Sequence, residues 1–309
     1  MRRGITYDTG FLPGAASRPV IDPDAVRRDL AVIATELHCD AVRITGGEPD
    51  RLDLAAGYAA EQGLSIWYSP FPVDLPPEAM HELYADCADR AERLRAAGAT
   101  VVFVTGCETS AFGAGFLPGA TYLDRMRAMA TADLDWWLSL GPVVERLNAF
   151  LTESVSLVRQ RFRGPVSYAS GPWEPIDWTP YDIVGVDAYR AAHNADSYVE
   201  EMRAHARHGK PVVVTEFGTC AYRGAGARGG SAWLVPDGAV PDESEQVGYL
   251  TELLDVFEAE GVDAAFWFTF AQWTKAGDAD LGSYGLVRML DDTRWTPKAA
   301  FRALADRYA

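Results

Sequence analysis

Short β-rich runs alternate with amphipathic helical runs along the whole chain, and this alternation restricts the fold more than any other feature. The β-rich runs lie at residues 4–8, 41–46, 64–70, 101–106, 165–169, 183–189, 211–216 and 264–270. This order favours a parallel sheet whose strands are joined by helices. Eight βα units without an interrupting linker predict a closed (β/α)₈ barrel, or TIM barrel, that forms a single domain over residues 1–309. A doubly wound open sheet is the alternative architecture.

The helical runs are recognised by apolar residues that recur at three- and four-residue steps. Residues 78–97, 142–162 and 245–258 show this pattern, which predicts amphipathic helices. The stretches "DPD" at 22–24 and "PPE" at 76–78 are typical of helix starts, and "TPKAAFRALADRY" predicts the last helix. Only residues 170–182, with three prolines, separate the fifth and sixth predicted strands. The fifth helix is therefore expected to be short or irregular.

Two connections are unusually long. Residues 107–138 follow the fourth predicted strand, and residues 217–244 follow the seventh. Both would leave the C-terminal face of a barrel, where the active site of this fold lies. Long loops in a compact domain are usually functional or disordered, so we expect these two to shape a site.

Composition and charge narrow the choice of partners. Hydrophobic residues make up 48% of the chain, which allows a sizeable core, and the net charge is −16. An acidic surface repels nucleic acid and anionic membranes, so neither is a predicted partner. No run approaches about 18 apolar residues, and no signal peptide is visible after "MRRGITYDTGF". These observations favour a cytoplasmic location.

The sequence offers no metal or cofactor motif of the required spacing. The cysteines are not spaced as metal ligands, alone or with histidine, which predicts reduced thiols; they are Cys39, Cys87, Cys107 and Cys220. The glycines of "GAGARGG" follow the seventh strand by several residues, and no helical pattern follows them. A phosphate-binding loop needs both a preceding strand and a following helix, so no cofactor is predicted.

Polar and aromatic side chains gather at the predicted C-terminal ends of the strands. The carboxyl ends of barrel strands converge on one mouth, so a substrate site is predicted there. A single such residue could equally be a satisfied structural group, and the shared placement of the set is the functional signal. The predicted substrate-binding residues are Tyr7, Asp8, Arg43, Tyr68, Tyr168, Trp173, Glu174, Asp187, Tyr189, Trp267 and Trp273.

Two further carboxylates stand out beside this set: Glu108, just after the fourth strand, and Glu216, in "VVVTEFG" at the end of the seventh. A carboxylate that ends a buried apolar strand is unfavourable unless a partner or a function requires it. Arg43 and Tyr189 are residue types that would hold Glu216 ionised and oriented. Structural roles are the alternative for both residues. Glu216 could serve only as an ion-pair partner of Arg43, and the long loop that follows Glu108 could move Glu108 away from the site.

Several stretches resemble the retaining glycoside hydrolases of clan A, the "4/7" superfamily. They are "VVVTEFG", "YDIVGVDAY", "AAFWFTFAQW" and "DLGSYGLVRMLDDTRWTPKAAFRAL". The resemblance covers nearly the full chain and implies double-displacement hydrolysis of a small glycoside or oligosaccharide. It implies that Glu216 is the nucleophile and Glu108 the acid/base, with carboxyl groups about 5–5.5 Å apart. Candidate sugar-stacking surfaces are Trp67, Trp173, Trp267 and Trp273. The chain is also similar to uncharacterised bacterial proteins sometimes labelled abortive-infection proteins, a label that implies no mechanism.

Two departures from the clan pattern keep other functions open. Cys107 stands where the clan usually has an asparagine that contacts the substrate 2-hydroxyl, and a thiol is a weak donor. Asp187 stands where many relatives have histidine or another residue. One alternative is a lyase, isomerase or cyclase of secondary metabolism that uses the same carboxylates for acid/base chemistry. The other is a non-catalytic barrel that binds a carbohydrate or another small molecule.

Overall fold

The computed structural model describes residues 1–11 and 17–309, and its centre is one eight-stranded parallel sheet. The strands follow the order β5-β4-β3-β2-β1-β8-β7-β6. Their bounds are β1 (Arg2–Asp8), β2 (Ala41–Gly46), β3 (Ser65–Pro70), β4 (Val101–Cys107), β5 (Val166–Ala169), β6 (Val184–Asp187), β7 (Val212–Phe217) and β8 (Ala264–Trp267). Beyond β5, the Ser170 N–H donates to the Gly185 carbonyl and the Asp187 N–H to the Ser170 carbonyl. These bonds bring β5 and β6 together, and the predicted (β/α)₈ barrel is confirmed.

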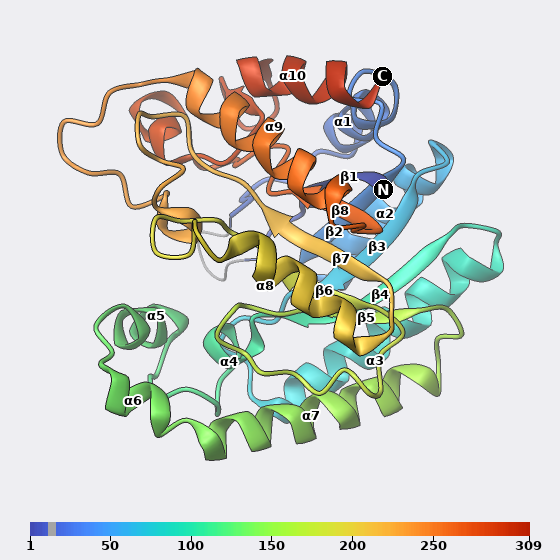
Figure 1. The fold of residues 1–309 in the computed structure, drawn as a ribbon. Coiled ribbons are helices and arrows are strands. Elements are labelled where there is room, and N and C mark those ends of the chain that lie inside the picture. The colour runs from blue at the N-terminus through green and yellow to red at the C-terminus, as the bar shows by residue number, and fades with distance from the viewer. Residues whose placement is uncertain (12–16) are drawn as a thin grey trace.

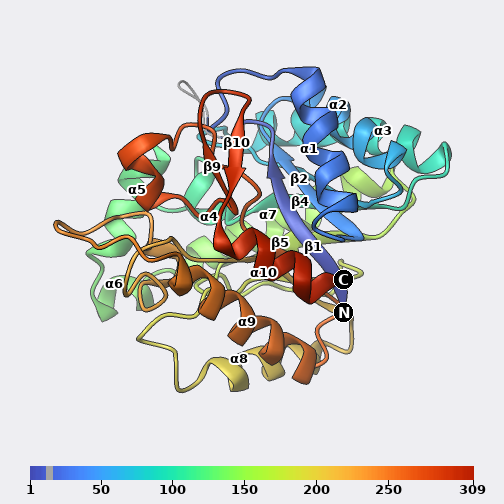
Figure 2. The ribbon, with the colours of Figure 1, turned by 90° about the horizontal axis from the view of Figure 1, so that it is seen from above.

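Helices surround the strands, as Figures 1 and 2 show. They are α1 (Pro23–Thr35), α2 (Pro49–Glu61), α3 (Pro77–Ala96), α4 (Thr109–Phe112), α5 (Tyr122–Ala130), α6 (Leu134–Leu138), α7 (Gly141–Arg159), α8 (Tyr198–Ala204), α9 (Glu243–Ala259) and α10 (Ala299–Tyr308). Three 3₁₀ segments are η1 (His205–His208), η2 (Gly229–Ser231) and η3 (Gly277–Gly282). Strands β9 (Val287–Met289) and β10 (Trp295–Pro297) form an antiparallel pair before α10. None of the described helices is long and apolar enough to cross a membrane.

Helix starts follow the predicted signals. The Asp22 carboxylate accepts the N–H groups of Asp24 and Ala25 and so caps α1. The proline at the first turn of α3 needs no N–H partner, which suits it to that position. Residues 170–183 contain no helix, because Pro172, Pro175 and Pro180 interrupt the segment. The irregular fifth connection is therefore confirmed.

Alternation along β7 separates the core from the mouth. Val212 and Val214 pack in the layer between strands and helices, whereas Val213 packs inside the barrel with Ala264 and Phe266. The register of β7 shifts on both sides near its end, against Asp187 of β6 and against Trp267 of β8. Such irregularities re-aim side chains. The valines of β7 are therefore buried on both faces of the sheet, and Glu216, near the C-terminal end of the strand, is presented to the mouth of the barrel.

The connection after β4 is more structured than the sequence predicts, because it contains α4, α5 and α6. Arg125 on α5 is fully buried and fastens this segment. Its guanidinium donates to the carbonyls of Ala111, Gly119 and Phe112 and pairs with Asp74. By contrast, the predicted long connection after β7 contains only η2 before α9 begins. Strands β6 and β8 end earlier than predicted, which leaves Tyr189 and Phe268 in the loops that follow them.

Candidate active site

Glu216 is held by the two residues that the sequence predicts as its partners. Arg43 Nη1 donates to Glu216 Oε1 at 2.6 Å, and the Tyr189 hydroxyl donates to Oε2 at 2.9 Å. The guanidinium is completely buried, and the glutamate side chain keeps 10% of its surface exposed. Arg43 is itself fixed by Ser69 at 3.2 Å and by the Thr215 carbonyl at 3.2 Å. A short charge-assisted bond inside the barrel therefore pairs the Glu216 carboxylate with a buried cation and fixes its orientation.

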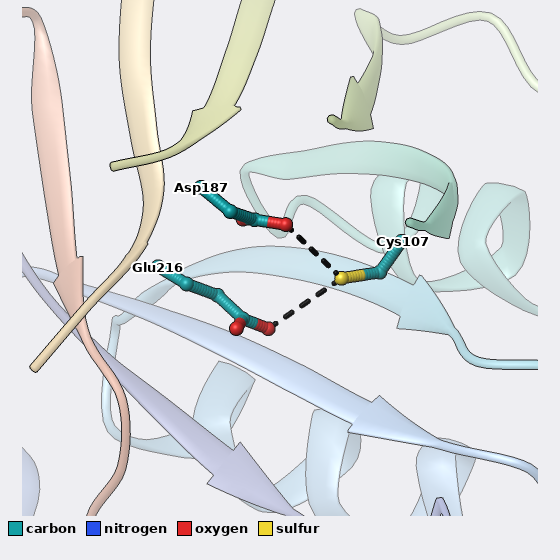
Figure 3. A group of neighbouring side chains, drawn as sticks. All are labelled: Cys107, Asp187 and Glu216. Atoms are coloured by element: carbon teal, nitrogen blue, oxygen red, sulfur yellow. Dashed lines mark hydrogen bonds between the residues drawn. The ribbon is translucent and has the colours of Figure 1, made fainter. Parts of the chain in front are cut away.

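Asp187 and Cys107 lie beside Glu216, as Figure 3 shows. The Cys107 thiol donates to Asp187 Oδ2 at 3.3 Å and lies 3.5 Å from Glu216 Oε1. Thr215 donates to Asp187 Oδ1 at 2.7 Å. Burial, and then the charge of Glu216, raise the pKa of Asp187 well above the ordinary range. Cys107 therefore bridges two carboxyl groups that lie too close together for both to ionise easily.

The ligand atoms of Cys107, Asp187 and Glu216 all lie within 4.8 Å of one another, so a metal ion has to be considered. Thiolate is the metal-binding form of cysteine, and burial raises the pKa of Cys107 well above its usual value. The Arg43 guanidinium already supplies the cation that pairs with Glu216. These groups form an ion pair with a bridging thiol, and this arrangement does not suit a bound metal ion.

Glu108 occupies an unusual backbone conformation at the mouth. Its φ of 43° and ψ of 44° place it in the left-handed region, which a non-glycine residue adopts at a cost of about 1–3 kcal/mol. The Glu108 N–H donates to the Ala169 carbonyl, and its carbonyl accepts the Ala111 and Phe112 N–H groups that open α4. Burial, and then the Asp187 and Glu216 charges, raise the pKa of Glu108 well above the ordinary range. Glu108 is therefore suited to carry a proton at neutral pH.

Glu174 and Tyr168 support the backbone around Glu108. Glu174 accepts the Ser110 N–H at 2.9 Å and the Tyr168 hydroxyl at 2.8 Å, and Tyr168 accepts the Thr109 N–H at 2.7 Å. Both side chains therefore form hydrogen bonds that hold the turn after Glu108. Trp173 donates through Nε1 to the Ser110 hydroxyl at 3.1 Å and remains partly exposed beside this turn.

Asp8 and Trp273 form a second buried group at the ends of β1 and β8. Asp8 accepts the Gly10 N–H at 2.6 Å, and burial raises the pKa of its carboxyl to about 6. Trp273 donates to the Asp8 carbonyl at 3.2 Å. The Arg18 guanidinium lies 3.6 Å over the Trp273 ring. This arrangement is a cation–π contact between Arg18 and the Trp273 ring.

Several predicted site residues lie away from the mouth. Tyr7 donates to Asp29 of α1 at 3.0 Å, and Tyr68 stacks with Phe103 in the layer between strands and helices. Trp267 packs on Phe217 in the same layer. Each neighbours an inward-facing residue, so strand alternation turns its side chain outward. Trp67 does face inward, but it is buried against Phe266 within the barrel.

Sequence reasoning missed several residues that the structure brings to the site. Thr215 contacts Asp187, Ser69 contacts Arg43, and Arg18 covers Trp273. Thr215 and Ser69 could have been found from the sequence, because they are hydroxyl residues near strand ends and every second residue of a strand faces the interior. No local pattern marks Arg18, since its role depends on a ring that is distant in the sequence.

Comparison with solved structures supports the architecture. A GH113 beta-1,4-mannanase is 15% identical at a TM-score of 0.69, with 100% of this chain and 99% of that chain covered. The GH113 beta-mannanase AaManA from Alicyclobacillus acidocaldarius is 17% identical at a TM-score of 0.65, with 99% and 96% covered. A β-glucuronidase from Ruminococcus gnavus is 15% identical at a TM-score of 0.64, with 100% of this chain and 50% of that chain covered.

No protein-family model matches the sequence, and no curated protein matches it. At this level of identity the structural neighbours show the fold alone. The resemblance to abortive-infection proteins stays a prediction from the sequence. The chain therefore has the (β/α)₈ barrel that the sequence predicted, a fold that it shares with these solved structures.

Proposed function

We propose that this protein is a retaining glycoside hydrolase that acts on a small glycoside or oligosaccharide. Glu216 is the nucleophile and Glu108 the acid/base. The observation that carries the proposal is the contrast between the two glutamates at the mouth. Glu216 is paired with the buried Arg43 guanidinium, whereas burial and nearby carboxylates raise the pKa of Glu108. Two carboxyl groups in such different environments can divide the roles of nucleophile and acid.

The proposed reaction has two steps. In the first, a Glu216 oxygen attacks the anomeric carbon while Glu108 donates its proton to the leaving oxygen, and the glycosidic C–O bond breaks. In the second, Glu108 removes a proton from water, the water oxygen attacks the anomeric carbon, and the ester to Glu216 breaks. Arg43 and Tyr189 orient the nucleophile through 2.6 and 2.9 Å bonds, and this positioning lowers the barrier.

The position of Asp187 favours a second candidate. Its carboxyl group lies within 4.8 Å of the Glu216 ligand atom, and burial raises its pKa. The buried carboxyl groups of Glu108, Asp187 and Glu216 would also suit proton transfer in a lyase, isomerase or cyclase. In that case the same residues would act without forming a glycosyl ester.

A panel of nitrophenyl glycosides of both anomeric configurations tests the proposal. The wild-type protein is expected to hydrolyse at least one sugar, with the configuration of the first-formed product retained in NMR spectra. Glu216→Gln is expected to lower kcat by roughly 10⁵-fold or more, as loss of a nucleophile does in other hydrolases. Glu145→Gln, an exposed glutamate on α7, is the matched control and should leave the rate unchanged.

The same panel separates the candidates. Inversion of configuration would overturn the double-displacement mechanism. Absence of hydrolysis for every sugar would favour the proton-transfer candidate or a binding protein. Binding of sugars in thermal-shift assays by both the wild type and Glu108→Gln, without turnover, would identify the binding protein.

A further inference from the structure

We propose that the substrate leaving group is an apolar, aromatic alcohol, bound by a continuous arc of aromatic rings at the mouth. This inference rests on the proposed function, because it assigns the group that Glu108 protonates. The aromatic arc consists of Tyr122, Phe112, Phe71, Phe11, Phe268, Tyr284 and Tyr189.

The rings of the arc touch one another in sequence. Tyr122 stacks on Phe112 with 5.7 Å between centroids, and Phe112 meets the edge of Phe71 at 4.9 Å. Phe71 lies 4.9 Å from Phe11, which lies 6.4 Å from Phe268. All these separations lie in the range of favourable aromatic pairs.

The remaining links lead to the nucleophile. Phe268 lies 5.8 Å from Tyr284, and Tyr284 lies 6.1 Å from Tyr189. The Tyr189 hydroxyl donates to Glu216. The arc therefore joins α5, α4 and the segments after β3, β1, β8 and β6 into one surface that ends at Glu216.

The arc combines buried supports with accessible rings. Phe71 and Tyr284 are buried, with 4% and 3% of their surfaces exposed. The other members, Tyr122, Phe112, Phe11, Phe268 and Tyr189, are partly exposed. Ligand sites are typically lined by aromatic side chains, with a few polar groups that fix orientation. Here those polar groups are the carboxyl groups of Glu108, Asp187 and Glu216.

The position of Glu108 indicates which part of the substrate contacts the aromatic arc. Glu108 protonates the leaving oxygen, so the leaving group must pass over this residue. Phe112 lies one helical turn away, and its N–H donates to the Glu108 carbonyl at 3.0 Å. Tyr122 stacks on Phe112 and extends the arc from α4 to α5. The leaving group therefore departs along the Phe112 and Tyr122 end of the arc.

The chemistry of this end argues against a sugar leaving group. The phenylalanines of the arc carry no hydrogen-bonding side-chain atoms, so the arc offers only the Tyr122 hydroxyl at this end, whereas each of the several hydroxyls of a sugar needs a partner when it is removed from water. The charged groups nearby, Asp74 and Arg125, pair with each other, and Arg125 also donates to three carbonyls. A flat apolar alcohol can bury its ring against this surface, and its single oxygen meets Glu108.

The test compares two alkyl glycosides of the sugar that the nitrophenyl panel identifies: 2-phenylethyl and 2-methoxyethyl. Both alcohols are of similar acidity, so leaving-group ability does not distinguish them. We expect kcat/KM to favour the phenylethyl glycoside by about tenfold or more, which corresponds to about 1.4 kcal/mol. Phe112→Ala should reduce this ratio towards one. Trp136→Ala, an aromatic residue of the same connection outside the arc, is the matched control and should keep the wild-type ratio.

A second measurement does not depend on turnover. Saturation-transfer NMR with 2-phenylethanol should show transfer to the phenyl ring in the wild type and in Trp136→Ala, and reduced transfer in Phe112→Ala and Tyr122→Ala. Hydrolysis with a ratio near one in the wild type, or equal transfer in all four proteins, would overturn the inference. Ring saturation that depends on Phe112, together with no hydrolysis of any glycoside, would uphold the aromatic site and reject the glycosidase.

Discussion

At the scale of single residues, Glu216 shows why a carboxylate can end a strand of buried valines. The burial of its charge is offset by Arg43 at 2.6 Å and by the Tyr189 hydroxyl at 2.9 Å. These contacts come from β2 and from the loop that follows β6, and both residues were predicted from the sequence. The prediction was possible because strand ends converge at one mouth. The bridging position of Cys107 was not predictable, since it depends on side-chain geometry.

Arg43→Gln tests how strongly the protein depends on this ion pair. Removal of one partner of a buried pair leaves the other charge uncompensated, which is expected to lower the free energy of unfolding by about 3–5 kcal/mol. Denaturant unfolding measures the change. Arg27→Gln is the control, because Arg27 and Glu61 form an exposed, solvent-screened pair whose loss should change the free energy of unfolding far less. Equal losses in the two variants would contradict the assigned role of Arg43.

Asp187→Asn tests what raises the pKa of Glu108. After burial, the Asp187 charge is the largest influence that raises the pKa of Glu108. Its removal should lower that pKa, so the alkaline limb of the kcat/KM profile should move to lower pH. The pH–rate profile of any hydrolysed glycoside measures the shift. An unchanged limb, or one that moves to higher pH, would show that the Asp187 charge does not raise the pKa of the acid.

At the scale of elements, the longest helices and the strands were predictable, and the short helices after β4 were not. Helices α3, α7 and α9 carry apolar stripes of helical period, and β7 begins with four β-branched residues. Helices α4 and α6 span four and five residues, too short for periodicity to reveal them. Helix α4 is held by tertiary contacts, and Arg125 provides two of these through the Ala111 and Phe112 carbonyls.

Arg125→Met is therefore expected to loosen the segment that carries Phe112 while the barrel remains folded. The substitution removes the donors to three carbonyls and leaves Asp74 without its cation. Hydrogen exchange in residues 109–125 should accelerate by about tenfold or more, which corresponds to a loss of about 1.4 kcal/mol of local stability. Exchange in α9, which packs elsewhere, serves as the internal control. Unchanged exchange in 109–125 would show that other contacts hold the segment.

At the scale of the whole molecule, the alternation of strands and helices was sufficient to predict the barrel. Each unit buries an apolar strand between helices and interior, so its pattern is readable locally. The site was predictable in part. Glu108, Asp187, Tyr189, Arg43 and Glu216 meet at the mouth, whereas Tyr7, Tyr68 and Trp267 lie between the strands and the helices. The face that each side chain takes depends on strand register, and this is set by pairing across the barrel.

The central claim is that Glu216 forms a covalent glycosyl ester. A 2-deoxy-2-fluoro glycosyl fluoride of the hydrolysed sugar should accumulate this ester, because the fluorine slows its breakdown. Mass spectrometry of proteolytic peptides should then find one added glycosyl group on Glu216, and none in Glu216→Gln. A label on Glu108 or Asp187, or continued turnover without any label, would contradict the account.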